Sequence, residues 1–183
     1  MIHLIIGPMY SGKTSELTKR IRRAKRELYN VIVVTHSWDT RYSQDGEIVT
    51  HDKEGFLGAH RVQTVEQVRQ LVTSMMDPGM PPWVFVDEAQ FITGDWSSFC
   101  MDLAHTGCNV TLAALNADWK RRAYPAITAI VADSTKTLKA VCHKCQQSAI
   151  WSKCLFPEKL EQGVLIGGAE SWEARCRKCI DMD

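Results

Sequence analysis

Four short apolar runs in the first two thirds of the chain predict strands. They span residues 2–6, 31–34, 83–86 and 110–115, and they are rich in valine, isoleucine and leucine. Continuous apolar runs of this length are typical of strands that are buried on both faces of a sheet. We therefore expect these segments to form the centre of a sheet.

Between these runs, three segments carry apolar residues at every third or fourth position and predict helices. They cover about 14–29, 65–76 and 99–104, and Gly107 is placed to end the third. Strands that alternate with helices imply a mostly parallel α/β sheet.

Two regions break this alternation. The polar stretch from residue 35 to about 61 has too many turn-forming residues for a regular element, so we expect a long functional loop there, with room for a hairpin. Beyond residue 141 the pattern changes to cysteines, turns and short apolar pieces. We therefore predict an α/β domain over 1–141 and a small lobe over 142–183.

Composition narrows the classes of protein. A chain of 183 residues, 45% of them hydrophobic, can bury a sizeable core. A net charge of +1 gives no global field that would recruit nucleic acid or anionic lipid, and the basic run 19–26 is best explained as the solvated face of a helix. No apolar stretch approaches the roughly 20 residues that span a bilayer, and no leader pattern is present, so we expect a soluble, intracellular protein without a membrane partner.

The strongest motif joins the first strand to the first helix and reads G-x-x-x-x-G-K-T. Its glycines let backbone N–H groups close around phosphate oxygens. The lysine that follows can contact the β- and γ-phosphates, and the next hydroxyl can bind Mg²⁺. The motif predicts a P-loop NTPase of the RecA-like class, with ATP and Mg²⁺ bound by Gly7, Pro8, Met9, Tyr10, Ser11, Gly12, Lys13 and Thr14.

Two adjacent carboxylates follow the apolar run 83–86. Asp87 is placed as a Walker B residue, which holds Mg²⁺ opposite the P-loop hydroxyl. Glu88 would accept a proton, and the residues alone leave open whether that proton comes from water or from a substrate hydroxyl.

Seven cysteines form an odd set in which two C-x-x-C pairs stand out. Two such pairs are typical of Zn²⁺ held by four thiolates, a closed structural site, although a redox pair or buried thiols remain alternatives. The predicted ligands are Cys142, Cys145, Cys176 and Cys179. Cys100, Cys108 and Cys154 are expected to be packing thiols.

Several motifs together resemble the type II thymidine kinase family over nearly the whole chain. They are the P-loop, Asp87–Phe91, Asp39–Ser43, Thr50–Asp52, Ala113–Leu115, Ala140–Cys142 and Val164–Gly168. The resemblance implies transfer of the γ-phosphate of ATP to the 5′-hydroxyl of thymidine, with Glu88 as the base. It also implies that Asp39 and Arg41 act beside Lys13 near the phosphates.

The same resemblance implies a base pocket of apolar and aromatic side chains, closed by a lasso loop over about 155–172. The implied contacts are Met9, Tyr10, Phe91, Leu115, Trp119, Tyr124, Ser152, Val164, Ile166, Gly167 and Trp172. The chain departs from the family pattern at Asn116, Ala117, Ser152, Cys154 and Trp172. These departures imply a looser pocket that would also admit deoxyuridine, because a single methyl contact is worth only about 1 to 3 kcal/mol.

Members of this family are homotetramers or dimers in the cytoplasm. The resemblance implies the same assembly and location for this chain. Two other hypotheses remain. One is an ATPase whose zinc lobe grips nucleic acid through Lys144, Arg177 and Lys178. The other is a zinc-stapled module that senses a nucleotide without turnover.

Overall fold

The computed structural model describes residues 1–37, 48–49, 55–56, 58–77, 79–160 and 169–182. Its largest sheet has six strands in the order β5-β2-β6-β7-β1-β8, and every neighbouring pair is parallel. The strands are β1 (Ile2–Gly7), β2 (Val31–His36), β5 (His60–Val62), β6 (Trp83–Val86), β7 (Asn109–Leu115) and β8 (Ser134–Thr137).

The four predicted strands form the centre of this sheet, which confirms the expected parallel α/β architecture. The two edge strands were not predicted. Every residue of β8 is exposed and its sequence is STKT, so it carries no apolar signal. The short β5 lies where we expected irregular chain to extend to about residue 61, and that part of the prediction is wrong. Within that region β3 (Ile48–Val49) and β4 (Gly55–Phe56) pair antiparallel, as the anticipated hairpin requires.

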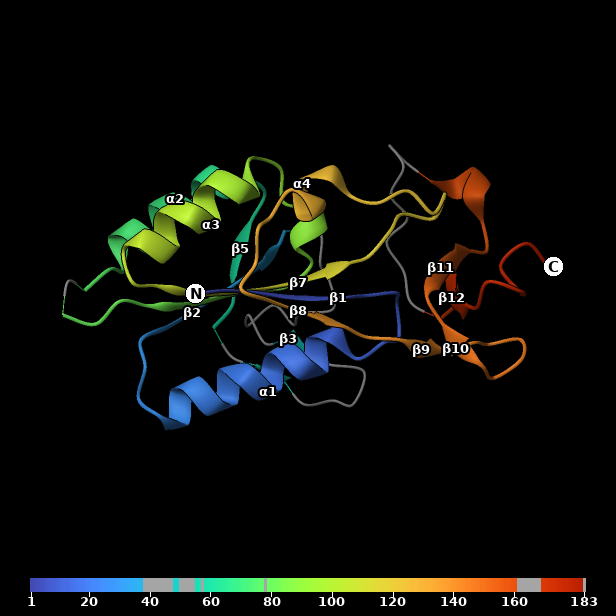
Figure 1. Ribbon diagram of the computed structural model, residues 1–183, viewed down its shortest axis with the longest axis horizontal. Coiled ribbons are helices and arrows are strands. Elements are labelled where there is room, and N and C mark those ends of the chain that lie inside the picture. Colours follow the sequence, from blue (N-terminus) through green and yellow to red (C-terminus); the bar gives the residue numbers. More distant parts are fainter. Residues whose placement is uncertain (38–47, 50–54, 57, 78, 161–168, 183) are drawn as a thin grey trace.

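Helices cover both faces of the sheet (Figure 1). The helix α1 (Lys13–Arg26) lies on one face, and α2 (Val65–Ser74) and α3 (Trp96–His105) lie on the other. The apolar stripe of α1 packs on residues of β1, β2, β6 and β7. On the other side, Thr64 and Gln67 form a capping box that starts α2, and the Asp95 carboxylate accepts a hydrogen bond from the backbone of Ser98 at the start of α3.

The first helix ends earlier than its apolar pattern suggests. Leu28 continues the spacing of the stripe, yet it is 83% exposed and has a φ of 62°. The Tyr29 N–H bonds to the Ala24 carbonyl and the Leu28 N–H to the Lys25 carbonyl, which is a Schellman motif. The expected extension of the helix to residue 29 is therefore wrong, because these bonds satisfy its last carbonyls and turn the chain away.

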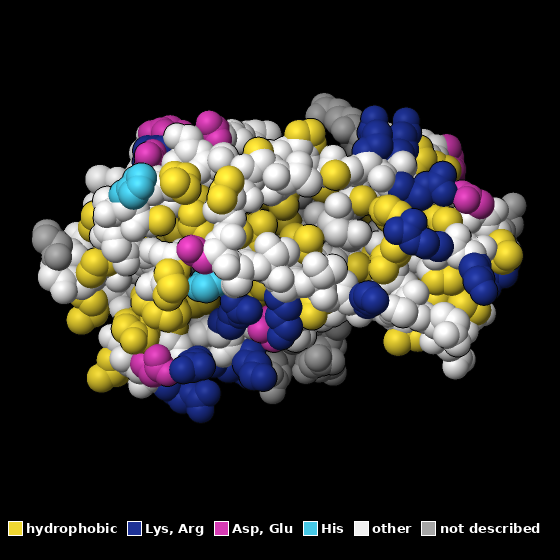
Figure 2. Space-filling model, viewed as in Figure 1, with side chains coloured by type: hydrophobic (Ala, Val, Ile, Leu, Met, Phe, Trp, Pro, Cys, Tyr) yellow, Lys and Arg dark blue, Asp and Glu magenta, His cyan; other side chains and the backbone are white. Residues whose placement is uncertain are grey.

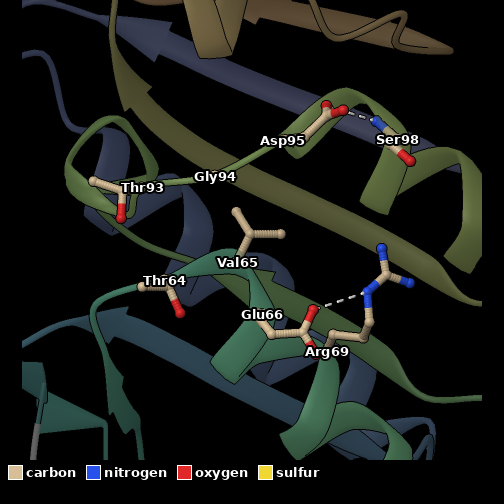
Figure 3. Close-up of a pocket in the computed structure, with 8 residues that line it drawn as sticks. All are labelled: Thr64, Val65, Glu66, Arg69, Thr93, Gly94, Asp95 and Ser98. Carbon is tan, nitrogen blue, oxygen red and sulfur yellow. Dashed lines mark hydrogen bonds and ion pairs between the residues drawn. The ribbon is translucent and has the colours of Figure 1, made fainter.

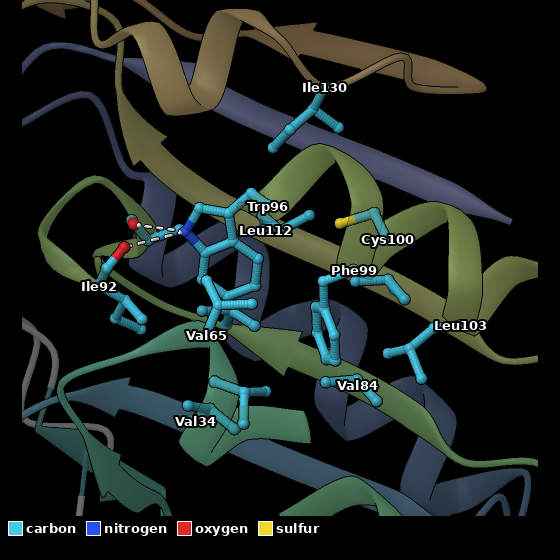
Figure 4. Packing of buried hydrophobic residues seen from close by; sticks show 14 of the residues in the cluster. Val34, Val65, Val84, Ile92, Trp96, Phe99, Cys100, Leu103, Leu112 and Ile130 are labelled. Carbon is cyan, nitrogen blue, oxygen red and sulfur yellow. Dashed lines mark hydrogen bonds between the residues drawn. The ribbon is translucent and has the colours of Figure 1, made fainter. Parts of the chain in front are cut away.

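Among the residues that the structure describes, Trp96 is the largest fully buried side chain, and it lies between α3 and the sheet (Figure 4). Its indole N–H lies 3.1 Å from the Ala89 carbonyl oxygen and 3.2 Å from that of Ile92. Those carbonyls belong to the short turn η1 (Ala89–Phe91) and the residue that follows it. These hydrogen bonds from the Trp96 indole anchor η1 to the hydrophobic core. The turn η1 directly follows Asp87 and Glu88.

The chain after β8 builds a smaller lobe beyond the C-terminal ends of the central strands (Figure 1). It has two antiparallel pairs, β9 (Ala140–Val141) with β10 (Ser148–Ala149) and β11 (Trp151–Cys154) with β12 (Trp172–Arg175). The short helices α4 (Pro125–Thr128) and η2 (Pro157–Lys159) complete the described elements. The division of the chain at residue 141 stays a prediction. None of the helices described is long and apolar enough to cross a membrane.

Candidate active site

The P-loop connects β1 to α1 at the C-terminal end of a central strand. Tyr10 and Gly12 both have left-handed backbones, with φ of 63° and 82°, and Ser11 lies between them. Left-handed residues in such alternation turn successive N–H groups inward to form an anion-binding nest. Gly7 is required for a different reason, since a Cβ there would lie 2.6 Å from the Ser11 hydroxyl and 2.7 Å from the Leu138 carbonyl oxygen.

Lys13 begins α1 and is only 7% exposed. Its ammonium donates a hydrogen bond of 2.8 Å to the Pro8 carbonyl, across the span of the loop. This contact keeps the positive charge inside the loop, where it can neutralise phosphate oxygens that the backbone N–H groups bind.

Thr14 and Asp87 lie 73 residues apart in sequence, and their side chains meet at the C-terminal ends of the parallel strands. The Thr14 hydroxyl donates a hydrogen bond of 2.9 Å to Asp87 Oδ2, while Asp87 Oδ1 accepts one of 3.0 Å from the Glu88 N–H. Asp87 is only 1% exposed. A hydroxyl and a carboxylate side by side are hard oxygen ligands of the kind that Mg²⁺ prefers, so the pair fits the predicted ion.

Glu88 follows with a left-handed backbone, φ 52° and ψ 39°. Gln90 Nε2 donates a hydrogen bond of 2.6 Å to Glu88 Oε2, and Gln90 Oε1 accepts one of 3.0 Å from the Leu115 N–H. A backbone N–H can only donate, so the orientation of the Gln90 amide follows from its surroundings. Sequence reasoning assigned no role to Gln90, and its place in the motif Asp87–Phe91 was the only signal.

The structure brings four of the expected base-pocket residues together where the lobe meets the P-loop. The Met9 N–H donates to the Ser152 hydroxyl at 2.9 Å, and the Tyr10 hydroxyl donates to the Trp172 carbonyl at 3.2 Å. Ser152 was expected beside the base, and here it also bonds to the P-loop backbone.

The other expected pocket residues lie at the ends of nearby elements. Leu115 ends β7, Phe91 ends η1, and Tyr124 caps α4. Burial raises the pKa of Tyr124 to about 12, and the negative charges of Asp118 and Glu88 act in the same direction. The Trp119 ring lies under the ammonium of Lys120, which is 4.8 Å from the ring centroid. Asp39, Arg41, Val164, Ile166 and Gly167 fall outside the described residues.

Three of the residues that depart from the family pattern are hydrogen-bonded or buried in the structure. The Asn116 side chain donates to the Ile150 carbonyl at 2.9 Å, which ties the end of β7 to the lobe. Ala117 and Cys154 are buried at 6% and 7% exposure.

The four predicted metal ligands converge in the lobe. The sulfur atoms of Cys142, Cys145, Cys176 and Cys179 all lie within 4.8 Å of one another, and none of the cysteines forms a disulfide. Ligands about 2.3 Å from a tetrahedral Zn²⁺ lie about 3.8 Å apart, so a small inward shift would complete such a site. Burial raises the pKa of Cys142, but N–H groups of Cys145, Cys176 and Lys144 outweigh it and bring the pKa down to about 6.

The remaining thiols behave as packing residues. Cys100, Cys108 and Cys154 are buried apart from the cluster, as predicted. Burial raises the pKa of the Cys100 thiol to about 12, which keeps it protonated and unreactive at neutral pH.

A separate hollow of about 370 Å³ lies between the starts of α2 and α3 (Figure 3). Its polar groups already serve the fold, because Thr64 and Asp95 cap the two helices and Glu66 pairs with Arg69. None of the predicted phosphate, base or metal ligands lines it.

Comparison with known proteins identifies the family. A model of the thymidine kinase family matches residues 1–180. The chain is 35% identical over 183 residues to a thymidine kinase of fowlpox virus (strain NVSL), and the match covers 98% of this chain and 96% of that protein. It is also 35% identical to the cytosolic thymidine kinases of Gallus gallus and Homo sapiens, over 97% of this chain and 75% and 72% of theirs. The chain therefore belongs to the thymidine kinase family.

Proposed function

We propose that this chain transfers the γ-phosphate of ATP to the 5′-hydroxyl of thymidine. The observation that carries the proposal is the position of Glu88, next to the Thr14–Asp87 pair and the P-loop, in a chain that matches thymidine kinases over its length. A carboxylate there is placed to receive the proton that the attacking hydroxyl loses, which is worth roughly 10²- to 10⁴-fold in rate.

On this proposal the donor half of the site is the P-loop with its surroundings. Residues 7–14 cradle the triphosphate, and Lys13 neutralises charge on the β- and γ-phosphates. Thr14 and Asp87 hold Mg²⁺, which offsets charge on the transferring group. Asp39 and Arg41 would act on the same phosphates.

On the acceptor side, Gln90 holds the Glu88 carboxylate, since its amide bridges Glu88 and the end of β7. The base would lie among Met9, Phe91, Leu115 and Tyr124, with Trp119 and the 155–172 segment completing the pocket. Deoxyuridine is a second acceptor in this proposal, because the departures at Asn116 and Ser152 alter residues around the base.

Three further features belong to the proposal. The four thiolates hold one structural Zn²⁺, the chain forms homotetramers or homodimers, and it works in the cytoplasm. The donor chemistry of the cysteine cluster supports the first. Cytosolic relatives support the last.

The test is a coupled assay of ADP formation with ATP-Mg²⁺ and each deoxynucleoside, using zinc-loaded protein. We expect turnover that depends on thymidine and falls by at least 100-fold in Glu88→Gln, because the amide cannot accept the proton. Glu66→Gln, on the exposed surface of α2, is the matched control and should keep full activity.

The same assay separates this function from a polynucleotide-stimulated ATPase. Basic side chains on the face in Figure 2 fall into separate groups, one along α1 and one on the lobe, rather than a continuous track. ADP formation that needs polynucleotide and ignores thymidine would overturn the kinase proposal. Nucleotide binding without turnover in all conditions would favour a sensor.

A further inference from the structure

We propose that Tyr10 is a positioning residue through which the four-cysteine lobe holds the P-loop in its anion-binding shape. The inference rests on the proposed function only in taking the P-loop as the nucleotide site. It gives the lobe a part in binding the phosphate donor, separate from any contact with the nucleoside.

The backbone of Tyr10 is the starting point. Its φ of 63° lies in the left-handed region, where a residue with a Cβ costs roughly 1 to 2 kcal/mol more than in its ordinary conformations. Gly12, at φ 82°, has no such cost. The nest needs both turns, so the loop depends on one conformation that its own sequence disfavours.

The Tyr10 side chain makes several contacts with the lobe. Its hydroxyl donates to the Trp172 carbonyl at 3.2 Å. The centroid of its ring lies 5.3 Å from that of His143, a residue that stands between the two cysteines of the first pair in the sequence. It also packs against the apolar cluster that contains Cys142, Cys176 and Cys179. These contacts tie the side chain of the strained residue to the lobe.

A second contact holds the neighbouring residue. The Met9 N–H donates to the hydroxyl of Ser152, on β11 of the lobe, at 2.9 Å. The lobe therefore also orients the Pro8–Met9 peptide, which lies one residue before the strained position. Two consecutive residues of the P-loop are thus bound to the same lobe, and these contacts offset the strain at Tyr10.

The test measures the affinity of zinc-loaded protein for ADP-Mg²⁺ by titration calorimetry, without a nucleoside. Tyr10→Ala keeps the strained conformation and removes the anchor, so we expect affinity to fall by about 5- to 30-fold. Tyr10→Gly also removes the anchor but adopts the left-handed region freely, so it should bind ADP more tightly than Tyr10→Ala. Tyr10→Phe keeps the ring and should lose only a few-fold.

Tyr29→Ala is the matched control, since Tyr29 stacks on Trp83 with ring centroids 4.6 Å apart and follows the end of α1 that is remote from the P-loop. Its affinity for ADP should equal that of the unmodified chain. Ser152→Ala, which tests the second contact from the lobe side, should weaken ADP binding by about three- to tenfold, the value of one hydrogen bond.

Two results would overturn the inference: Tyr10→Ala within twofold of the unmodified chain, or Tyr10→Gly no better than Tyr10→Ala. If a Tyr10 variant does not fold, unchanged affinity in Ser152→Ala has the same meaning. Failure of the unmodified chain to bind ADP would instead reject the P-loop as a nucleotide site and with it the proposed function.

Discussion

Two non-glycine residues with left-handed backbones lie at the proposed phosphate site. Tyr10 lies in the P-loop and Glu88 follows the buried Asp87, with φ of 63° and 52°. Such conformations persist only where surrounding contacts hold them. Tyr10 is held by the lobe, and the turn after Glu88 is held by Gln90 and by the Trp96 indole. At both positions, contacts with neighbouring residues stabilise a left-handed backbone, and that backbone sets the direction of the side chain.

The first prediction concerns Gln90. Replacing it by methionine keeps the volume and removes the hydrogen bond to the Glu88 carboxylate. Bonds to charged groups are worth about 1.5 to 3 kcal/mol, so we expect kcat to fall by tenfold or more while KM for ATP stays within about twofold. Steady-state kinetics with varied ATP and thymidine measure both.

The matched control for Gln90 is Gln70→Met, on an exposed position of α2. It should leave both constants unchanged. A Gln90→Met enzyme with unaltered kcat would show that Glu88 keeps its position without the amide.

At the scale of elements, each helix starts and stops through local hydrogen bonds. Thr64 and Gln67 close a capping box at the start of α2, and the Asp95 carboxylate caps α3. The Schellman motif after α1 ends that helix although Leu28 would extend its apolar stripe. Apolar spacing thus located the helices, while hydrogen bonds at their ends decided their lengths.

The second prediction tests one of these ends. Thr64→Ala removes the acceptor for the Gln67 N–H and should lower the free energy of unfolding by about 1 kcal/mol. For a chain of this size that corresponds to a Tm about 2 to 4 °C lower.

Thermal unfolding followed by circular dichroism provides the measurement. Thr73→Ala, at an exposed position in the last turn of the same helix, is the control and should leave Tm unchanged or slightly raised, because alanine is the better helix former. Equal Tm values for the two variants would contradict a stabilising cap.

At the scale of the whole molecule, the lobe contacts the C-terminal ends of the central strands, where the proposed site lies. Asn116 ties β7 to the lobe, and Met9 and Tyr10 tie the P-loop to it. The lobe has short strands and few buried apolar residues apart from its cysteines. A structural metal is the usual way for such a small unit to stay folded, since zinc supplies roughly 10 kcal/mol or more of apparent folding energy.

The third prediction follows. Purified protein should carry one Zn²⁺ per chain, and Cys145→Ser should lose most of it, because one thiolate is missing from a site of four. Metal analysis by mass spectrometry measures the content, and thermal unfolding should begin at a lower temperature. Cys108→Ser, outside the cluster, should retain the metal. Full zinc content in Cys145→Ser would exclude that cysteine as a ligand.

The sequence by itself determined the central strands, the three main helices, the P-loop, the acidic pair and the set of four cysteines that cluster in the lobe. Each of these depends on residues that are close along the chain, such as an apolar run, a helical spacing or a short motif. The edge strands could not be found in this way. Strand β8 is polar and fully exposed, and it forms because the parallel edge of β1 offers hydrogen bonds.

Only the tertiary structure decided how these parts are joined. It placed Gln90 between Glu88 and Leu115, and it brought the Ser152 hydroxyl and the Trp172 carbonyl into hydrogen bonds with the P-loop. No local pattern encodes such contacts, because a hydrogen bond between distant residues depends on where the packed sheet and lobe bring their backbones. The P-loop motif was visible in the sequence, whereas the support that holds its strained residue became visible only in the fold.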